Sequence, residues 1–382
     1  MNQQSAKRQA RAWKRAEKIY RAVGTAVCLA VLLVQAAMGW RLAEPVSGSG
    51  RPDTEAAAPV SPTPAVTQAP ASVRAPEKED GSGQAGRTLL PQGRTPAEPV
   101  PGWQQDEKGW WYACDGQTGY QSGWQEIGGQ QYHFDQEGYR DTGWTAIGGK
   151  GYYFDENGVL DPDADSSRLL ALTFDDGPGP YTARLLDLLE ENGARATFFM
   201  LGKQVEEYGA DTIPRMRELG CIIGSHSYDH PNLKKAGAET ARQQFQQTDE
   251  LIARYNNGQG AQVIRFPYGE YTKELSADTG RPCIYWDVDS QDWKSKNAEA
   301  VKQEIRSNIE GGDIILMHDI YETTVEACEE LIPELKAQGW QFVTVRELAA
   351  ANGYDLEPGV TYFGFTSYEK ERSSVTDENR DV

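Results

Sequence analysis

Two adjacent carboxylates, Asp175 and Asp176, end an apolar run and precede a Gly-Pro turn in the stretch LALTFDDGPGPYT. Two neighbouring ionised carboxylates repel, which raises the pKa of one of them unless a cation lies close by. A bound metal removes that difficulty, because one aspartate can ligate it while the other takes a proton from water. A solvated turn is the alternative interpretation.

Three of the four histidines in the chain follow apolar, strand-like runs, as Asp175 and Asp176 do. They are His226 and His230, in GSHSYDH, and His318, in LMHD. Two neutral imidazoles and one carboxylate suit a divalent transition metal and leave coordination positions open, which is the catalytic pattern. An HxxxH pair alone is more often structural, but together with TFDDGP and LMHD it predicts a catalytic metal centre. The fourth, His133, is predicted to be one more aromatic side chain of a repeat.

The elements that position these residues alternate between strand-like and amphipathic, helix-like runs from residue 167 onward. The strand-like runs are RLLALTF, ATFFM, CIIG, QVIRF, CIYWDV, DIILMHD and QFVTV. Seven strands alternating with helices predict a parallel α/β architecture, either open or closed into a barrel. In such folds the active site forms at the carboxyl ends of the strands, where five of these seven runs place reactive residues.

Five motifs in this order, TFDDGP, HSYDH, RFPYG, DSQDW and LMHD, resemble those of the polysaccharide deacetylases, the NodB-homology carbohydrate esterases. The resemblance covers residues 167–352 and implies a distorted (β/α) barrel of about seven parallel strands that removes acetyl groups from N-acetylated sugars. It also implies a divalent transition metal, with zinc as the first candidate and cobalt or another metal as alternatives. One departure is Phe266, where many relatives have proline.

The resemblance implies a role for each matching residue. Asp176, His226 and His230 would hold the metal. Asp175 would be the general base that activates the water, and His318 the general acid that protonates the leaving amine. The backbone N–H of Tyr268 would donate to the oxyanion, Arg195 would tether the base, and Asp292 would orient the acid. Leu316 and Trp293 would form walls of the acetyl pocket, and Arg265 would border the groove.

Residues 101–162 repeat with a period of about twenty residues that begins at Trp103, Trp124 and Trp144. Aromatic residues around GG turns predict short hairpins, which must stack because one hairpin cannot bury its own aromatics. The segment resembles choline-binding or cell-wall-binding repeats, in which aromatics of neighbouring hairpins cage a quaternary ammonium. The implied ligand is choline or a glycan, and a structural spacer is the alternative. The candidate ligand residues are Trp103, Trp110, Trp111, Trp124, Tyr132, Trp144 and Tyr152.

The remaining segments have contrasting compositions. Residues 1–21 carry seven Lys/Arg and one acid, which predicts a cytoplasmic basic tail. Residues 22–40 carry no charge and match a hydrocarbon core of ~30 Å, which predicts a transmembrane signal-anchor, with a cleavable signal peptide as the alternative. Residues 41–100 hold ten of the twenty prolines and no aromatic residue, which predicts a disordered linker. Residues 353–382 are predicted to be a partly disordered tail.

A cell-surface enzyme follows from these parts, with its N-terminus in the cytoplasm and its catalytic domain in the cell wall, or secreted if the anchor is cleaved. The net charge of −19 argues against a nucleic-acid partner. The favoured substrate is peptidoglycan N-acetylglucosamine. The alternatives are N-acetylmuramic acid, chitin-like or poly-N-acetylglucosamine glycans, acetylated xylan and other O-acetyl esters. A non-catalytic wall-binding protein would show damage among the metal and acid–base residues, and none is visible.

Overall fold

The computed structural model describes residues 87–89, 101–115, 118–120 and 122–365. The predicted basic tail, the predicted anchor and most of the predicted linker lie outside the described residues, as do residues 366–382. Within the described ranges, no helix combines the length and apolar character that a membrane crossing requires.

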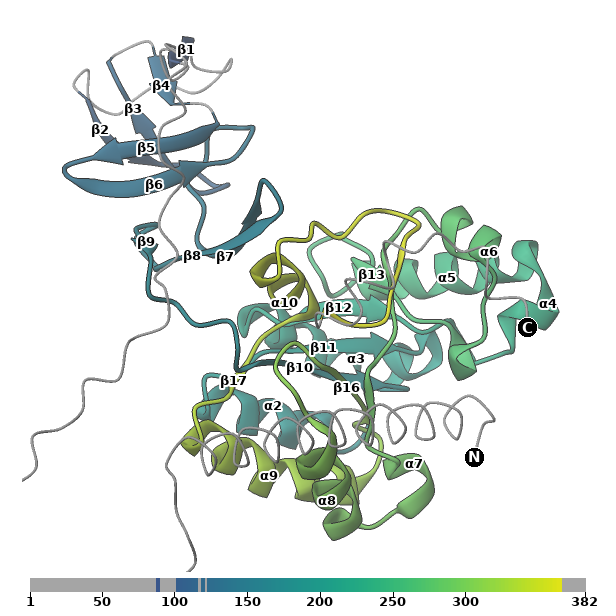
Figure 1. Ribbon diagram of the computed structural model, residues 1–382. Coiled ribbons are helices and arrows are strands. Elements are labelled where there is room, and N and C mark those ends of the chain that lie inside the picture. The colour runs from purple at the N-terminus through teal and green to yellow at the C-terminus, as the bar shows by residue number, and fades with distance from the viewer. Residues whose placement is uncertain (1–86, 90–100, 116–117, 121, 366–382) are drawn as a thin grey trace, which may run out of the picture. The chain divides into compact units, whose positions relative to one another are not determined.

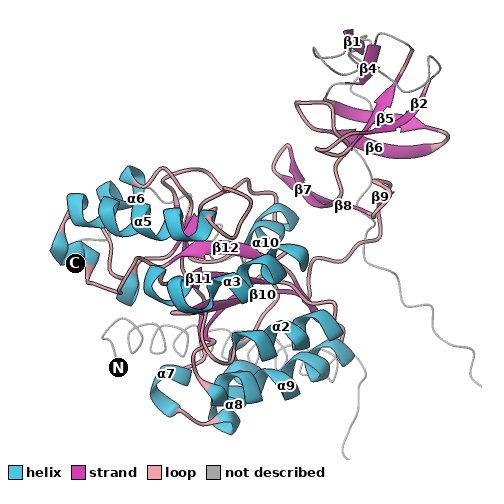
Figure 2. Cartoon of the chain, turned by 180° about the vertical axis from the view of Figure 1, so that it is seen from behind, coloured by secondary structure: helices cyan, strands magenta, loops and turns pink. Residues whose placement is uncertain are grey.

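The repeats form antiparallel hairpins, as their pattern predicts (Figure 2). The second and third hairpins turn at Gly128-Gly129 and Gly148-Gly149, where both glycines of each pair have positive φ, as a two-residue hairpin turn requires. One described part of the predicted linker, β1 (Arg87–Leu89), pairs with β4 in antiparallel fashion. The other strands are β2 (Gly102–Gln105), β3 (Trp110–Ala113), β4 (Thr118–Tyr120), β5 (Gly123–Ile127), β6 (Gln130–Phe134), β7 (Gly143–Ile147), β8 (Lys150–Phe154) and β9 (Leu160–Asp161).

The prediction of a parallel α/β architecture is confirmed, because every strand pair described from residue 169 onward is parallel. The sheet runs in the order β15-β16-β10-β11-β12-β13-β14-β18, with β17 also paired to β10 (Figure 1). Its strands are β10 (Leu169–Asp175), β11 (Ala196–Met200), β12 (Ile222–Ser225), β13 (Val263–Ile264), β14 (Cys283–Ile284), β15 (Val288–Asp289), β16 (Ile314–His318), β17 (Gln341–Phe342) and β18 (Thr361–Tyr362).

Most of the helices pack on the outer face of this sheet, whereas α10 packs with the cluster on its inner face (Figures 1 and 2). They begin and end where local signals predict. For example, α10 starts with a capping box between Thr344 and Glu347, and α2 is followed by Gly193 with a φ of 54°. The helices are α2 (Thr182–Glu191), α3 (Gly202–Glu218), α4 (Leu233–Ala236), α5 (Ala238–Ala253), the 3-10 turn η1 (Pro267–Gly269), α6 (Lys273–Asp278), α7 (Asp292–Ser295), α8 (Ala298–Asn308), α9 (Glu322–Ala337) and α10 (Val345–Ala351).

The central strand β10 is buried along its whole length, and its two faces pack differently. Leu170 and Phe174 belong to the large hydrophobic cluster that also contains the buried faces of α2 and α9. Leu169 and Ala171 belong to a second cluster, which is formed by residues from several strands and α10. Because side chains alternate along a strand, Asp175 lies on the same face as Leu169 and Ala171. The pleat therefore directs this carboxylate toward the interior of the curved sheet.

The sheet curls strongly without closing. The run CIYWDV forms two strands, β14 and β15, which lie near opposite ends of the strand order. Only three residues separate them, so Ile284 and Val288 are at most roughly 14 Å apart. No strand pair among the described residues joins β15 to β18, and the barrel is therefore incomplete.

The sheet also continues past residue 352, where the predicted catalytic domain ends. β18 pairs with β14 in parallel, and Phe365 is buried in the cluster that contains α10. The predicted tail thus contributes an edge strand of two residues.

Candidate active site

A buried ion pair holds Asp175 at the carboxyl end of β10. Its Oδ1 accepts a hydrogen bond of 2.7 Å from Nη1 of Arg265, which also donates to Thr173 Oγ1 at 2.9 Å. Arg265 is fully buried and donates to the backbone carbonyls of Ile284 and Tyr285. The guanidinium therefore has partners for its charge and its N–H groups.

Three side chains from two loops converge beside Asp175 with geometry that suits a metal ion. Asp176 Oδ1 lies 3.8 Å from Nε2 of His226 and 3.6 Å from Nε2 of His230. One ligand atom of each residue lies within 4.8 Å of the others. Asp176 Oδ1 is buried without a hydrogen-bond partner among the described residues, which costs free energy unless a cation compensates it. The three residues fit a divalent cation.

The surroundings of the two histidines prepare their Nε2 atoms for a metal. Nδ1 of His226 lies 2.7 Å from the backbone carbonyl of Arg265, so it carries the proton and leaves the Nε2 lone pair free. Burial, followed by the charge of His226, lowers the pKa of His230, which favours the neutral imidazole that a metal requires. Asp176 and His230 both have positive φ, at 69° and 65°. Such backbone strain in non-glycine residues is typical of functional sites.

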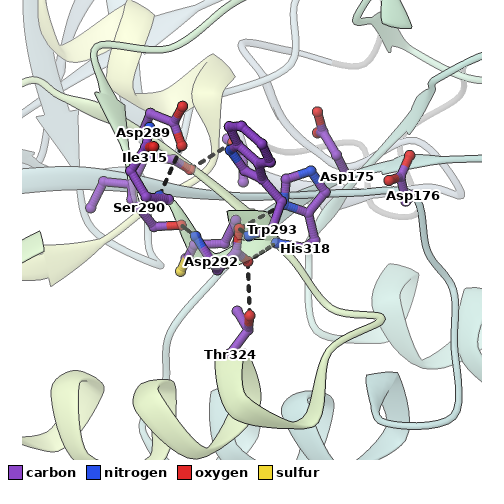
Figure 3. A network of polar contacts seen from close by, with 12 residues as sticks. Asp175, Asp176, Asp289, Ser290, Asp292, Trp293, Ile315, His318 and Thr324 are labelled. Carbon is purple, nitrogen blue, oxygen red and sulfur yellow. Dashed lines mark hydrogen bonds and ion pairs between the residues drawn. The ribbon is translucent and has the colours of Figure 1, made fainter. Parts of the chain in front are cut away.

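His318 ends β16, the strand next to β10, and lies directly opposite Asp175 in the register. Its Nδ1 is 2.8 Å from Asp292 Oδ1, and its backbone N–H donates to Asp292 Oδ2 at 2.7 Å (Figure 3). Burial lowers the pKa of His318, but the hydrogen bond and charge of Asp292, with smaller contributions from Asp175 and Asp176, raise it to about 9. The imidazolium is therefore the form that can donate a proton from Nε2 near neutral pH.

Three further predicted residues lie around this centre. Tyr268, on η1, is 64% exposed, and its ring packs edge-on against His230 with centroids 4.4 Å apart. Trp293, at the start of α7, is 47% exposed, and its side chain hydrogen-bonds to Asp289. Leu316 is buried and pairs in register with Thr173, so it shares the interior face with His318. The exposed aromatics offer surfaces on which a sugar can pack.

The prediction that Arg195 tethers the base is wrong. Arg195 precedes β11, and Phe199, at the other end of that strand, is the residue that pairs with Asp175. Arg195 therefore lies at the amino-terminal edge of the sheet, where it forms an ion pair with Glu347. Arg265 forms the ion pair with the base instead. The prediction that Arg265 borders the groove is also wrong, since its side chain has no exposed surface.

Sequence reasoning missed two supporting residues. Thr324 Oγ1 donates to Asp292 Oδ2 at 2.8 Å, and no sequence signal marks this threonine (Figure 3). Asp319 is fully buried beside Gly177 and accepts a hydrogen bond from Thr182, and burial raises its pKa to about 7. The LMHD motif contains Asp319 and could have identified it. A Cβ at Gly177 would collide with its carboxylate, which explains the glycine of TFDDGP.

The repeat aromatics pack between successive hairpins with a recurring geometry. Trp103 of the first hairpin lies 4.9 Å from Tyr132 of the second, and Trp124 of the second lies 4.9 Å from Tyr152 of the third, measured between ring centroids. Trp144 of the third hairpin instead packs against the hydrophobic cluster that contains α10. These contacts bury the tyrosines, which accounts for the stacking that the repeat predicts.

The two adjacent tryptophans of β3 point to opposite faces, as the strand period requires. Trp111 is 3% exposed, whereas Trp110 is 36% exposed. The structure therefore brings Trp103, Trp110 and Tyr132 to one junction between hairpins, and places Trp111 in the interior as a packing residue.

Similarity to known proteins covers both halves of the described chain. Residues 163–281 match the polysaccharide deacetylase family, and residues 121–160 match the choline-binding repeat. A peptidoglycan-N-acetylglucosamine deacetylase of Bacillus cereus is 31% identical over 194 residues, which cover 48% of this chain and 89% of that relative. This chain belongs to the polysaccharide deacetylase family.

Two longer relatives in the deacetylase family share the same region. The peptidoglycan-N-acetylglucosamine deacetylase PgdA of Listeria monocytogenes is 37% identical over 206 residues, or 54% of this chain and 43% of that protein. The peptidoglycan-N-acetylmuramic acid deacetylase PdaC of Bacillus subtilis is 38% identical over 184 residues, or 48% of this chain and 39% of that protein. This deacetylase-family chain thus spans less than half the length of these two relatives. The family predicted from the five motifs is confirmed.

Proposed function

We propose that this chain is a metal-dependent deacetylase that removes acetyl groups from N-acetylglucosamine of peptidoglycan. The observation that carries the proposal is the grouping of Asp176, His226 and His230 beside a buried carboxylate and a carboxylate-linked histidine. Such a set provides metal ligands, a base and an acid at one edge of the sheet, which is what amide hydrolysis requires. The similarity to peptidoglycan deacetylases supports the choice of glycan.

Asp176 and the Nε2 atoms of His226 and His230 are the groups that would hold a divalent cation, with zinc as the first candidate. When bound, this cation supplies Lewis acidity to the acetamido carbonyl and to water. Asp175 is free to act as a base because its Oδ2 faces His226 at 3.6 Å, while its Oδ1 is held by Arg265. Its rigid placement limits the reorganisation needed when it accepts a proton.

The proton transfers follow from the positions of Asp175 and His318 on neighbouring strands. Asp175 takes a proton from the water that attacks the carbonyl carbon. His318 donates a proton to the amide nitrogen as the C–N bond breaks, so that acetate and a free amine leave. The backbone N–H of Tyr268 donates to the developing oxyanion, and Leu316 and Trp293 line the space for the methyl group. Asp292 orients His318 and keeps it protonated.

We also propose the arrangement of the whole chain at the cell surface. Residues 1–21 would remain in the cytoplasm, residues 22–40 would anchor the protein in the membrane, and residues 41–100 would act as a tether. Residues 101–162 would bind a wall component, choline or glycan, beside the catalytic domain, which begins at residue 167. Tethering raises the effective concentration of the enzyme on its polymeric substrate. The location in the wall favours peptidoglycan over chitin-like glycans or xylan.

The experiment that tests the proposal is acetate release from N-acetylated peptidoglycan by the full-length protein, with zinc and with a chelator. We expect release that stops on chelation and returns with zinc. Mass spectrometry of the digested glycan would identify the deacetylated sugar, glucosamine or muramic acid. Parallel assays on chitin oligomers and acetylated xylan test the other glycans.

A matched pair of variants separates chemistry from folding. Asp175→Asn is expected to abolish release, whereas Asp211→Asn, at an exposed position of α3, is expected to leave it unchanged. Faster acetate release from xylan than from peptidoglycan would contradict the assignment of peptidoglycan as the substrate. A folded, zinc-loaded protein that releases acetate from none of these glycans would contradict the deacetylase activity.

A further inference from the structure

One cation of the repeat array, Arg140, contacts three successive hairpins. It follows β6 of the second hairpin, where it forms a bridge with Phe134. Its backbone N–H donates to the carbonyl of Trp110 in the first hairpin at 2.9 Å. Its guanidinium donates to the carbonyls of Asn157 at 2.6 Å and Glu156 at 2.8 Å, in the turn that follows β8 of the third hairpin.

The same guanidinium lies over two tryptophan rings of the first hairpin. Its central carbon is 5.5 Å from the ring centroid of Trp103 and 5.4 Å from that of Trp110. Trp103 is in turn packed against Tyr132 of the second hairpin. A cation within about 6 Å of an aromatic face is attracted by the ring quadrupole, and tryptophan is the strongest partner. Two rings of the first hairpin thus lie against the positive charge, and a ring of the second hairpin packs against one of them.

The guanidinium has little other electrostatic compensation. It forms no ion pair with a carboxylate among the described residues, and its Nε atom is buried without a hydrogen-bond partner there. Burial lowers the pKa of Arg140, although the charge of Asp155 opposes that change. The two tryptophan faces and the two carbonyls are therefore the main groups that hold this charge.

The next junction repeats the tryptophan–tyrosine contact without the cation, and Gln130 stands where the first hairpin has Trp110. Trp124 packs against Tyr152 as Trp103 packs against Tyr132. The residues in register with Arg140 in the other repeats are Tyr120 and Leu160, neither of which is charged. Within the described part of the chain, no lysine or arginine lies over Trp124. Arg140 is therefore specific to the first junction and is not a general feature of the repeat.

We propose that Arg140 is a built-in occupant of the aromatic site formed by Trp103, Trp110 and Tyr132. The site has the chemistry that takes a quaternary ammonium ion, and the guanidinium fills it. The first junction is consequently closed to choline in the native protein and acts as a fixed joint between three hairpins. This inference does not rest on the deacetylase activity.

Calorimetric titration of the full-length protein with choline chloride tests the proposal by counting bound choline. Trp110→Ala removes one wall of the site at an exposed position, and it is expected to leave the number of choline molecules bound by the native chain unchanged. Arg140→Ala is expected to bind one more choline per chain than the native protein. The double variant Arg140→Ala/Trp110→Ala is expected to lose that additional choline.

A matched control comes from the deacetylase domain, where Arg168 lies 5.8 Å from the ring centroid of Trp340. Arg168→Ala exposes a single tryptophan face without a second wall, so it should add no choline. Loss of a choline site in Trp110→Ala alone would show that choline already occupies the junction, and would overturn the proposal. A folded Arg140→Ala variant that gains no choline would also overturn it. If Arg140→Ala does not fold, the number of choline molecules bound by the native chain and by Trp110→Ala still tests whether choline occupies the junction.

Discussion

The deacetylase domain and the repeat array each hold one arginine with backbone carbonyls and aromatic rings, but only the arginine of the domain also pairs with a carboxylate. In the domain, Arg265 is fully buried, pairs with Asp175 and donates to three further oxygen atoms. In the array, Arg140 has no carboxylate partner among the described residues and lies between tryptophan faces. The ion pair fixes Arg265 and Asp175 in one mutual position, whereas the tryptophan faces beside Arg140 attract a cation without strict direction.

The two regions also differ in the distance along the chain between contacting groups. Asp175 and Arg265 are 90 residues apart, while the Trp103–Tyr132 and Trp124–Tyr152 contacts join adjacent hairpins. The domain therefore brings together groups from many strands, and the array repeats one contact between neighbouring hairpins. Because of this difference, we expect substitutions in the domain and in the array to affect activity and stability differently.

The largest effect is expected at the base. Asp175→Asn removes the proton acceptor, and kcat/KM for acetate release should fall by ~10²–10⁴-fold. Zinc content should persist because Asp176 and both histidines remain, and elemental analysis would measure it. A variant that keeps more than a tenth of its activity would exclude Asp175 as the base.

The next effect concerns stability and compares two arginines of the same domain. Arg265→Gln leaves Asp175 buried without its partner, so the free energy of unfolding should fall by ~3–5 kcal/mol. Arg195→Gln removes an ion pair whose arginine is 43% exposed, which should cost only ~0–1 kcal/mol. Urea unfolding of both variants measures the difference, and equal losses would contradict the assignment of Arg265 as the buried partner.

A third prediction concerns pH. The pKa of His318 is raised from 6.5 to about 9, so the protonated acid is lost, and kcat/KM falls, as pH rises through that value. The stabilisation from this protonation is likewise complete below pH 6.5 and disappears toward pH 9. A bound cation offsets the contributions of Asp175 and Asp176, so the holoenzyme should lose activity at a somewhat lower pH.

Asp292→Asn removes the main cause that raises this pKa and leaves burial, which lowers it. The alkaline limb of the kcat/KM profile should therefore shift to lower pH by about one unit or more. Thr324→Val removes one hydrogen bond to Asp292 and should produce a smaller shift in the same direction. An unchanged limb in Asp292→Asn would exclude His318 as the titrating acid.

The smallest effect is expected in the array. Trp124→Ala removes the contact with Tyr152 and should destabilise the array by roughly 1–3 kcal/mol. Hydrogen exchange should increase in residues 122–161 and stay unchanged in strands β10, β11 and β16. Acetate release from soluble oligosaccharides should remain within a factor of about two, since no array residue contributes to the proposed chemistry. Increased exchange in the central strands would show that the two regions unfold together.

Much of this organisation was predictable from the sequence because its signals are local. The hairpin turns, the alternation of strands and helices, and the five motifs each depend on residues close together in the chain. The positions of Asp175-Asp176, His226 and His230 after strand-like runs predicted their grouping, since the carboxyl ends of parallel strands share one edge of the sheet, and the family resemblance indicated Asp176 as the ligand. The edge strand β18 escaped prediction because two residues paired at an edge carry too little pattern.

The sequence by itself determined the family, the repeat and the residue types that the chemistry requires. Only the tertiary structure decided which arginine pairs with Asp175, because Arg195 and Arg265 are both cations next to strands in the sequence. The strand register places Arg195 at the opposite edge, and the curl of the sheet brings Arg265 into the interior. The position of Arg140 between two tryptophans is likewise a product of stacking. Charged residues that are far apart in the sequence come into contact only where packing brings their helices and strands together. A local sequence pattern contains no information about such contacts.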